Sequence, residues 1–303
     1  MADLSARVWI ALAAVYIVWG STYLAIAIGI ETLPPLVMAG TRFGFAGLLL
    51  LAIVGRKMPR RPTLEELRNA AIIGTALCLG GNGLVTIAEA RIASGTAALL
   101  VATVPLWLAS LDRVVLGARL SRGVTAGLLV GFIGTALLVQ PGGTGDMIGA
   151  LQVAAAAALW ASGSLFARRS AAVAPPLANI GFQMLFGGLA TLVVATLGGE
   201  WSELDLSAMS ASSAYAWLYL VFAGSLIGYT AYVWLLRNAP TSVVGTYAYV
   251  NPVIAVSLGM VIRDERLAGQ TLLGGAIVLA SVAVIVATGK RKRSVSDMPV
   301  EPA

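Results

Sequence analysis

A single arginine is the clearest functional candidate in this sequence. Arg42 lies inside a long apolar segment, eight residues after Pro34, which places it roughly 12 Å below the start of a helix at about 1.5 Å per residue. An ionisable group at that depth in a membrane costs roughly 2.5–3.5 kcal/mol on insertion scales, so it is a functional candidate by default. Its guanidinium either binds a substrate carboxylate or phosphate through paired hydrogen bonds, or clamps helices through backbone carbonyls, Glu31 or Glu89.

Two prolines lie at matching positions in two other apolar segments. Asn251 precedes Pro252, and a proline lacks the N–H that the carbonyl four residues earlier needs in a helix. Pro105 has the same effect in its own segment. Because freed carbonyls near mid-membrane are typical of transporter sites, we expect helix breaks at Pro105 and Pro252 to flank one central site. Kinks that serve packing alone are the alternative.

Amide and aromatic side chains at similar depth complete the candidate set. Amides inside a helix bundle either bond helices together or line a wet cavity. Aromatic rings offer a stacking surface, and tyrosine adds a hydroxyl that can orient a ligand. The candidate substrate-binding residues are Trp19, Arg42, Asn82, Trp160, Gln183, Tyr229, Tyr247 and Asn251. Core packing is the competing role for the aromatic residues, and helix bonding for the amides.

No catalytic constellation accompanies these residues. The sequence has no histidine and a single cysteine, and it lacks a phosphate-binding glycine loop with its lysine and paired carboxylates at depth. We therefore predict that the protein is not an enzyme, and that it has no metal site and no cofactor.

Apolar helices must position these side chains. The chain is 58% hydrophobic and 11% charged, whereas a soluble domain carries about 25% charged residues. Apolar runs of about 20 residues, the length that crosses a bilayer, recur along almost the whole chain. We predict ten transmembrane helices over residues 8–30, 34–54, 70–88, 92–111, 124–139, 148–167, 177–197, 214–236, 243–262 and 272–288.

The basic residues between these segments predict orientation. With both termini in the cytoplasm, 16 of the 20 Lys and Arg lie inside, and only Arg91, Arg263 and Arg266 lie outside, as the positive-inside rule requires. The +6 charge is therefore spread over loops and forms no stripe of the kind that binds nucleic acid. We predict a multi-pass protein of the inner (cytoplasmic) membrane, surrounded by membrane lipids, with no nucleic-acid partner.

The sequence contains an internal repeat. A shift of 141 residues superposes Trp19 on Trp160, and a shift of 147 superposes Gly81 on Gly228 and Pro105 on Pro252. We divide the chain into repeats at 1–142 and 146–289, followed by a basic tail at 290–303. Because each repeat holds an odd number of helices, the second enters the membrane in the opposite orientation. The predicted fold is an all-α membrane protein of two inverted five-helix repeats, an arrangement typical of transporters.

Four motifs carry a resemblance to a known family. They are WGSTY at 19–23, PPLVMAGTRF at 34–43, GNGLVTIAEA at 81–90 and TYAYVNPVIAV at 246–256. With them the chain resembles the EamA-type ten-helix exporters of the drug/metabolite transporter superfamily. The resemblance implies a central cavity shared by the first four helices of each half, with the fifth and tenth at the periphery, and export of metabolites such as amino acids. The family's acidic turn is present at Glu265, but the first copy has Ala118 in its place, which argues against a symmetric role for that acid.

Repeat and resemblance together predict a transporter of small metabolites, such as amino acids, related neutral or zwitterionic compounds, or drugs. A channel-like facilitator and a lipid-handling or scaffold protein are the alternatives. Energy would come from the substrate gradient, from exchange, or from ions coupled at acids near the helix ends, namely Glu31, Glu89, Asp112 and Glu265. The sequence is compatible with a monomer and with a homodimer.

Overall fold

The computed structural model describes residues 5–117, 120–139, 146–239, 241–244 and 246–289. The regular structure within these ranges is all helical. Eight helical segments there are long and apolar enough to cross a membrane, and two shorter apolar helices lie at Tyr247–Ile262 and Gly269–Ile285. The predicted ten-helix, all-α fold is confirmed. The basic tail and the first copy of the acidic turn, at 118–119, lie outside the described residues.

Several of the ten spans consist of more than one helical piece. The first half contains α1 (Ala6–Gly29), α2 (Pro35–Val54) with η1 (Gly55–Lys57), then α3 (Leu64–Gly74), η2 (Thr75–Gly83) and α4 (Leu84–Ala88) as the third span, α5 (Ser94–Val101) and α6 (Val104–Leu116) as the fourth, and α7 (Arg122–Val139). The second half contains α8 (Met147–Ala167), α9 (Pro176–Leu197), η3 (Glu200–Ser202), then α10 (Ala211–Tyr219), η4 (Leu220–Ile227) and α11 (Gly228–Asn238) as the eighth span, α12 (Thr241–Val244) and α13 (Tyr247–Ile262) as the ninth, and α14 (Gly269–Gly289).

The third span begins at Leu64, six residues before the predicted start. Thr63 and Glu66 form a capping box, in which the Thr63 hydroxyl accepts from the Glu66 N–H at 3.2 Å and the Glu66 carboxylate accepts from the Thr63 N–H at 2.8 Å. Arg60 also donates two hydrogen bonds to that carboxylate. A capping box satisfies two free N–H groups of the first turn. The helix therefore extends into polar residues that a hydropathy window leaves out.

Helices α2 and α9 cross closely through glycines. A Cβ on Gly188 would lie 2.4 Å from the backbone nitrogen of Gly44, and one on Gly47 would lie 2.8 Å from the carbonyl oxygen of Gly181. Gly47 and Gly188 are related by the shift of 141 residues. Close approach of backbones through small residues is the usual basis of helix association in membranes. This contact joins the two repeats at equivalent positions.

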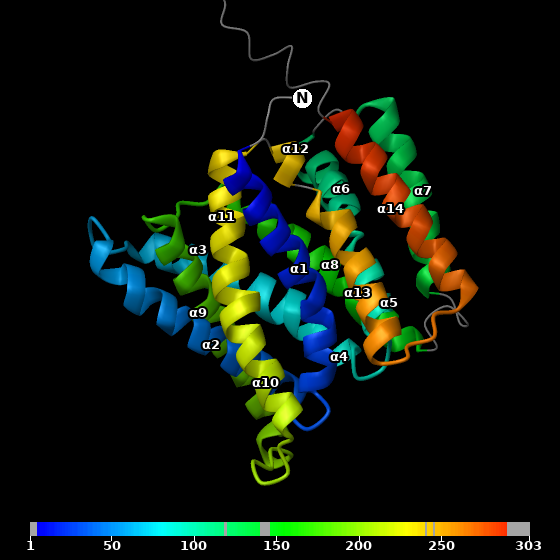
Figure 1. Ribbon diagram of the computed structural model, residues 1–303. Helices are drawn as coiled ribbons and strands as arrows, with labels where there is room; N and C mark the ends of the chain where they lie inside the picture. Colours follow the sequence, from blue (N-terminus) through cyan, green and yellow to red (C-terminus); the bar gives the residue numbers. More distant parts are fainter. Residues whose placement is uncertain (1–4, 118–119, 140–145, 240, 245, 290–303) are drawn as a thin grey trace, which may run out of the picture.

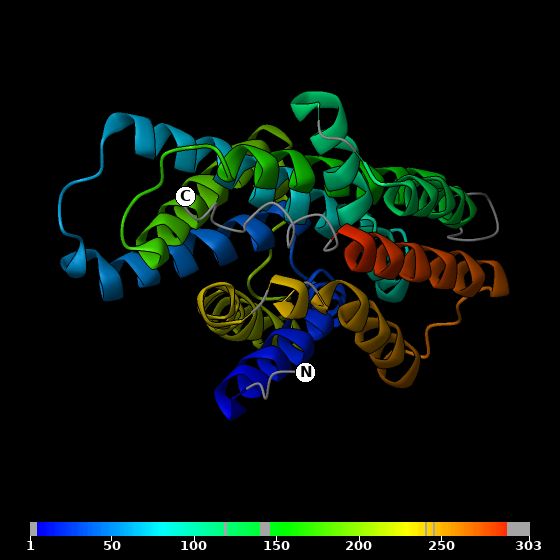
Figure 2. The same ribbon diagram turned by 90° about the horizontal axis from the view of Figure 1, so that it is seen from above.

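Helices α7 and α14 form a second pair of equivalents, side by side at one end of the molecule (Figures 1 and 2). Here too glycine allows the contact, because a Cβ on Gly134 would lie 3.0 Å from the carbonyl oxygen of Gly274. The pair lies at the periphery of the bundle, as the family resemblance implies.

The third and eighth spans each contain a π-helical segment, η2 and η4. The two segments overlap when the repeats are superposed by the shift of 147 residues. A π-helix widens the hydrogen-bonded turn and is frequently found at functional sites. Gly81, Asn82 and Gly83 lie in η2, so the first three residues of the GNGLVTIAEA motif belong to this widened turn.

The two prolines do not act alike, and the predicted break at Pro252 is wrong. The fourth span is interrupted after Val101, and Pro105 lies in the first turn of α6. Pro252 lies inside the continuous helix α13. A proline removes one helical donor, and here tight packing on α1 accompanies the continuous helix, since a Cβ on Gly20 would lie 3.2 Å from the Asn251 carbonyl oxygen.

Candidate substrate-binding cavity

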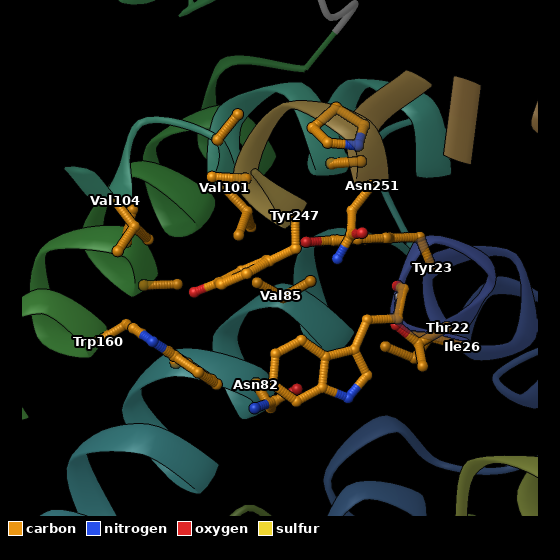
Figure 3. A pocket seen from close by; sticks show the side chains of 18 of the residues that line it. Thr22, Tyr23, Ile26, Asn82, Val85, Val101, Val104, Trp160, Tyr247 and Asn251 are labelled. Atoms are coloured by element: carbon orange, nitrogen blue, oxygen red, sulfur yellow. Dashed lines mark hydrogen bonds between the residues drawn. The ribbon is translucent and has the colours of Figure 1, made fainter. Parts of the chain in front are cut away.

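A cavity of about 170 Å³ lies where the two repeats meet. Its lining comes from α1, α2, the third and fourth spans, α8, α11 and α13. Figure 3 shows Tyr23, Tyr247 and Trp160 pointing toward this space from three separate helices. The peripheral pair α7 and α14 contributes no residue to the lining that the structure describes.

Most of the residues singled out from the sequence line this cavity. They are Trp19, Arg42, Asn82, Pro105, Trp160, Tyr229, Tyr247, Asn251 and Pro252. Gln183 is the exception. It lies on α9, where its backbone carbonyl faces α3 so closely that a Cβ on Gly74 would be 2.0 Å from the oxygen. Its helix carries the contact between repeats and contributes nothing to the cavity wall that the structure describes.

Sequence reasoning missed Tyr23, which lines the cavity beside Thr22 and Ile26. A signal for Tyr23 was available, because it follows Trp19 by four residues and residues so spaced share a face of a helix.

Four aromatic rings pack together on one side of the cavity. The Trp19 ring centroid lies 5.2 Å from that of Tyr229, 5.2 Å from that of Tyr232 and 5.5 Å from that of Tyr247. Tyr232 and Tyr247 also contact each other edge to face, at 5.7 Å. Aromatic pairs of this kind are worth about 0.5–1.5 kcal/mol beyond their buried area. The cluster ties α1 to α11 and α13, and three of its four rings, those of Trp19, Tyr229 and Tyr247, line the cavity.

The two repeat-related tryptophans each pack on a glycine of the other half. A Cβ on Gly228 would lie 2.3 Å from the Trp19 Nε1, and a Cβ on Gly81 would lie 2.6 Å from the Trp160 Cε3. Trp19 also donates from Nε1 to the carbonyl of Gly224, in η4, at 3.1 Å.

The corresponding carbonyl in η2, that of Leu77, accepts instead from the Asn82 side chain at 3.2 Å. Among the described residues, the Trp160 indole has no hydrogen-bond acceptor. The contacts between tryptophan and glycine therefore involve equivalent residues in the two repeats, while the hydrogen bonds of the two tryptophans differ.

Arg42 is 4% exposed and faces the cavity from α2. Its Nε donates to the Ser225 hydroxyl in η4 at 3.2 Å, and its guanidinium carbon lies 4.6 Å from the centroid of the Phe43 ring. Within the described part of the chain no carboxylate lies within ion-pair distance, and the two terminal nitrogens make no hydrogen bond. Arg42 is thus held by one hydroxyl, with most of its donors left for another partner.

Neither acid named as a clamp for Arg42 bonds to it. Glu31 pairs with Arg263, which joins the end of α1 to the end of α13. Glu89 is 7% exposed, and neither of its oxygens has a hydrogen-bond partner among the described residues.

Ion pairs join helix ends at both faces of the bundle. The pair Glu31–Arg263 joins the first and ninth spans. Arg168 and Asp112, 2.7 Å apart, join the sixth and fourth spans, which are their equivalents in the repeat. Because α1 and α8 run in opposite directions through the bundle, these two ion pairs lie at opposite faces.

A protein-family model matches this architecture over both halves, at residues 5–140 and 147–287. The description of that model is the EamA-like transporter family. The chain belongs to this family. Its membership, the two repeats and the apolar spans agree on a membrane transport protein.

Among curated EamA relatives, the chain is 38% identical to the uncharacterized inner membrane transporter YedA of Escherichia coli (strain K12), over 92% of this chain and 90% of that protein. The family assignment made from the four sequence motifs is thereby confirmed. It is 25% identical to a probable amino-acid metabolite efflux pump of Salmonella typhimurium, over 90% of this chain and 92% of that one. A crystal structure with 19% identity shares the fold at a TM-score of 0.61, covering 94% of this chain and 98% of that chain.

Proposed function

We propose that this protein exports small zwitterionic metabolites, such as amino acids, across the inner membrane by alternating access. The observation that carries the proposal is the cavity between the repeats, where the two terminal nitrogens of the buried Arg42 guanidinium and the buried Asn251 amide oxygen have no hydrogen-bond partner among the described residues. The protein acts as a carrier and performs no chemical step.

The polar groups of the cavity match the two ends of a zwitterion. The terminal nitrogens of Arg42 are donors in the geometry that a carboxylate accepts bidentately. The Oδ1 of Asn251 is buried and without a partner among the described residues, so it is an acceptor for an ammonium group. Arg42 on α2 and Asn251 on α13 come from different repeats. A ligand bound to both would therefore bridge the two halves that must move relative to each other.

The apolar part of the wall and its size restrict the ligand further. The aromatic cluster around Trp19 offers ring faces and edges to a side chain or to a cationic group. An engineered cavity of about 150 Å³ holds a benzene-sized molecule. A cavity of about 170 Å³ therefore has room for a small amino acid.

The repeat supplies the means of access from both sides. Inverted repeats give two nearly equivalent packings of the same parts, and exchange between them opens a midplane site to one face and then to the other. The ion pairs Glu31–Arg263 and Asp112–Arg168 fit this scheme, because each fastens one face. The names of the two curated relatives support the inner membrane and the amino-acid class. The loop charges support cytoplasmic termini.

Counterflow in proteoliposomes tests the proposal. Purified protein is reconstituted, vesicles are loaded with one unlabelled amino acid at a time, and uptake of the labelled compound is followed. We expect saturable uptake that internal substrate accelerates. Uptake that never saturates or accelerates would indicate a channel, and no uptake of any amino acid would contradict the proposed substrate class.

The role of Arg42 is tested in the same assay. Arg42→Ala should lose counterflow of an amino acid, while the exposed Arg61→Ala serves as a matched control that keeps it. The methyl ester of the same amino acid lacks the carboxylate, so its uptake should be the same in Arg42→Ala and in the wild type. Equal loss for acid and ester would reduce Arg42 to a structural residue.

A further inference from the structure

Of the four acids near the helix ends, three are fully engaged. Glu31 pairs with Arg263, and Asp112 pairs with Arg168. Glu265 accepts from the N–H of Ser94 at 3.0 Å, from its hydroxyl at 2.7 Å and from the N–H of Gly95 at 3.1 Å, and so caps the first turn of α5. These contacts give each of the three a structural role.

Glu89 is different in both burial and bonding. It is 7% exposed, and neither carboxyl oxygen has a hydrogen-bond partner within the part of the chain that the structure describes. An ionised carboxylate taken out of water without partners is very costly, so such a group takes up a proton and becomes neutral. The neutral acid removes that cost.

Glu89 lies at the end of α4, four residues after the cavity-lining Val85. Its N–H donates to the Val85 carbonyl at 2.9 Å, so it continues the helical turn that begins at Val85, a residue of the cavity wall. The titratable and charged groups that act on it come from every side: Tyr23 of α1, Arg42 of α2, and Arg263 and Glu265 after α13. Tyr23 and Arg42 also line the cavity, so the charge on Glu89 acts electrostatically on two residues of the cavity wall.

We propose that Glu89 is the proton-binding site that couples export to a proton gradient, an inference that rests on the proposed function. In the closed arrangement Glu89 is a neutral carboxylic acid. When the site opens to the cytoplasm, water enters, the O–H bond breaks, and the proton leaves to that side as substrate binds. When it opens outward, the carboxylate takes a proton from the other side as substrate leaves. One proton enters for each substrate exported, and no other reactant is needed.

The ion pair between Glu31 and Arg263 explains how the proton on Glu89 affects the closure of the face that this pair fastens. Arg263 is bonded to Glu31 while it also acts electrostatically on Glu89. A charged Glu89 competes with Glu31 for this arginine, whereas a neutral one does not. Protonation therefore favours closure of that face, and proton loss weakens it.

Infrared spectroscopy of the purified protein tests the site without any substrate. The wild type should show the carbonyl band of a protonated carboxylic acid at neutral pH, shifted in heavy water. The band should disappear in Glu89→Gln, which keeps the size and the neutral charge of the acid, and persist in Glu31→Gln. Absence of the band from the wild type, or its persistence in Glu89→Gln, would overturn the proposal.

Transport measurements separate coupling from carriage. With one amino acid on both sides and no pH gradient, Glu89→Gln should still show counterflow, at a lower rate than the wild type because a neutral side chain at position 89 favours closure of that face. When the outside is made acidic, the wild type should move substrate outward against its gradient, and Glu89→Gln should lose this pumping completely. If the wild type shows counterflow but no response to the gradient, the coupling proposal fails and the proposed function stands. If no amino acid is carried, the proposed function fails, and the infrared result still decides the proton site.

Discussion

The indole Nε1 of Trp19 donates a hydrogen bond to the carbonyl oxygen of Gly224, 3.1 Å away in the π-helical segment of the opposite repeat. Trp160, its partner in the repeat, packs on the equivalent glycine, Gly81, but with the six-membered ring edge at Cε3 where Trp19 meets Gly228 with Nε1. Its indole N–H has no acceptor among the described residues. One tryptophan is thus fixed to the opposite repeat by a hydrogen bond, while the other lines the cavity without one.

Replacing the two tryptophans separately should expose this asymmetry. Trp19→Phe removes the partly buried hydrogen bond to Gly224, so we expect it to lower the free energy of unfolding by about 0.5–1.5 kcal/mol, with a lower Tm in detergent. Trp160→Phe should leave the Tm nearly unchanged and weaken substrate binding, seen as a larger KM for counterflow. Equal effects of the two variants on Tm would contradict the assignment of different roles.

The glycines beneath the two indoles should not tolerate a methyl group. In Gly228→Ala the new Cβ would lie 2.3 Å from the Trp19 Nε1, and in Gly81→Ala it would lie 2.6 Å from the Trp160 Cε3. The rings must move, and overpacking of this kind costs typically 1–3 kcal/mol. Gly44→Ala is the matched control, because its Cβ would meet nothing within 4 Å. The midpoint temperature of unfolding and the rate of counterflow should both fall in Gly228→Ala and Gly81→Ala, and both should be unchanged in Gly44→Ala.

The spans and the repeat could be predicted because their signals are strong and local. An apolar run of bilayer length is readable in any window, and Trp19 with Trp160 or Pro105 with Pro252 marks the repeat by sequence spacing alone. Depth along a helix also follows from counting residues, so the mid-membrane position of Arg42 is predictable from its distance to Pro34.

The remaining features depend on contacts that no window contains. Each π-helical segment lies beside a tryptophan of the other repeat. Trp160 packs on Gly81 in η2, and Trp19 packs on Gly228 directly after η4. Gln183 looks equivalent to Asn82 by composition and depth, yet its helix packs on α2 and α3. Pro252 stays within a helix that packs on Gly20. In each case the neighbour, and not the residue itself, decides the outcome.

Asn251 should decide whether the ligand must carry an amino group. Asn251→Leu keeps the branched shape and the number of side-chain heavy atoms but removes the unpartnered Oδ1 that we assign to the ammonium. Loss of one hydrogen bond to a charged group is worth about 1.5–3 kcal/mol, so the KM for an amino acid should rise more than tenfold. The analogue with hydrogen in place of the amino group should compete equally well in wild type and variant. If the analogue competes differently in wild type and variant, the Asn251 amide has a packing role and does not bind the ammonium group.

The ion pairs at the two faces should bias the transporter in opposite directions. Each is exposed to solvent, and such pairs contribute about 0–1 kcal/mol, so removing one changes the ratio of open to closed states by up to roughly fivefold. The sole native cysteine, Cys78, is buried, and a Cys78→Ser background allows Val85→Cys in the cavity wall to act as a reporter. Labelling with a membrane-impermeant thiol reagent from the outside should speed up in Glu31→Ala and slow down in Asp112→Ala. The double charge reversal Glu31→Arg with Arg263→Glu should restore the original rate, and failure of that rescue would show that the contact between α1 and α13 does not gate access.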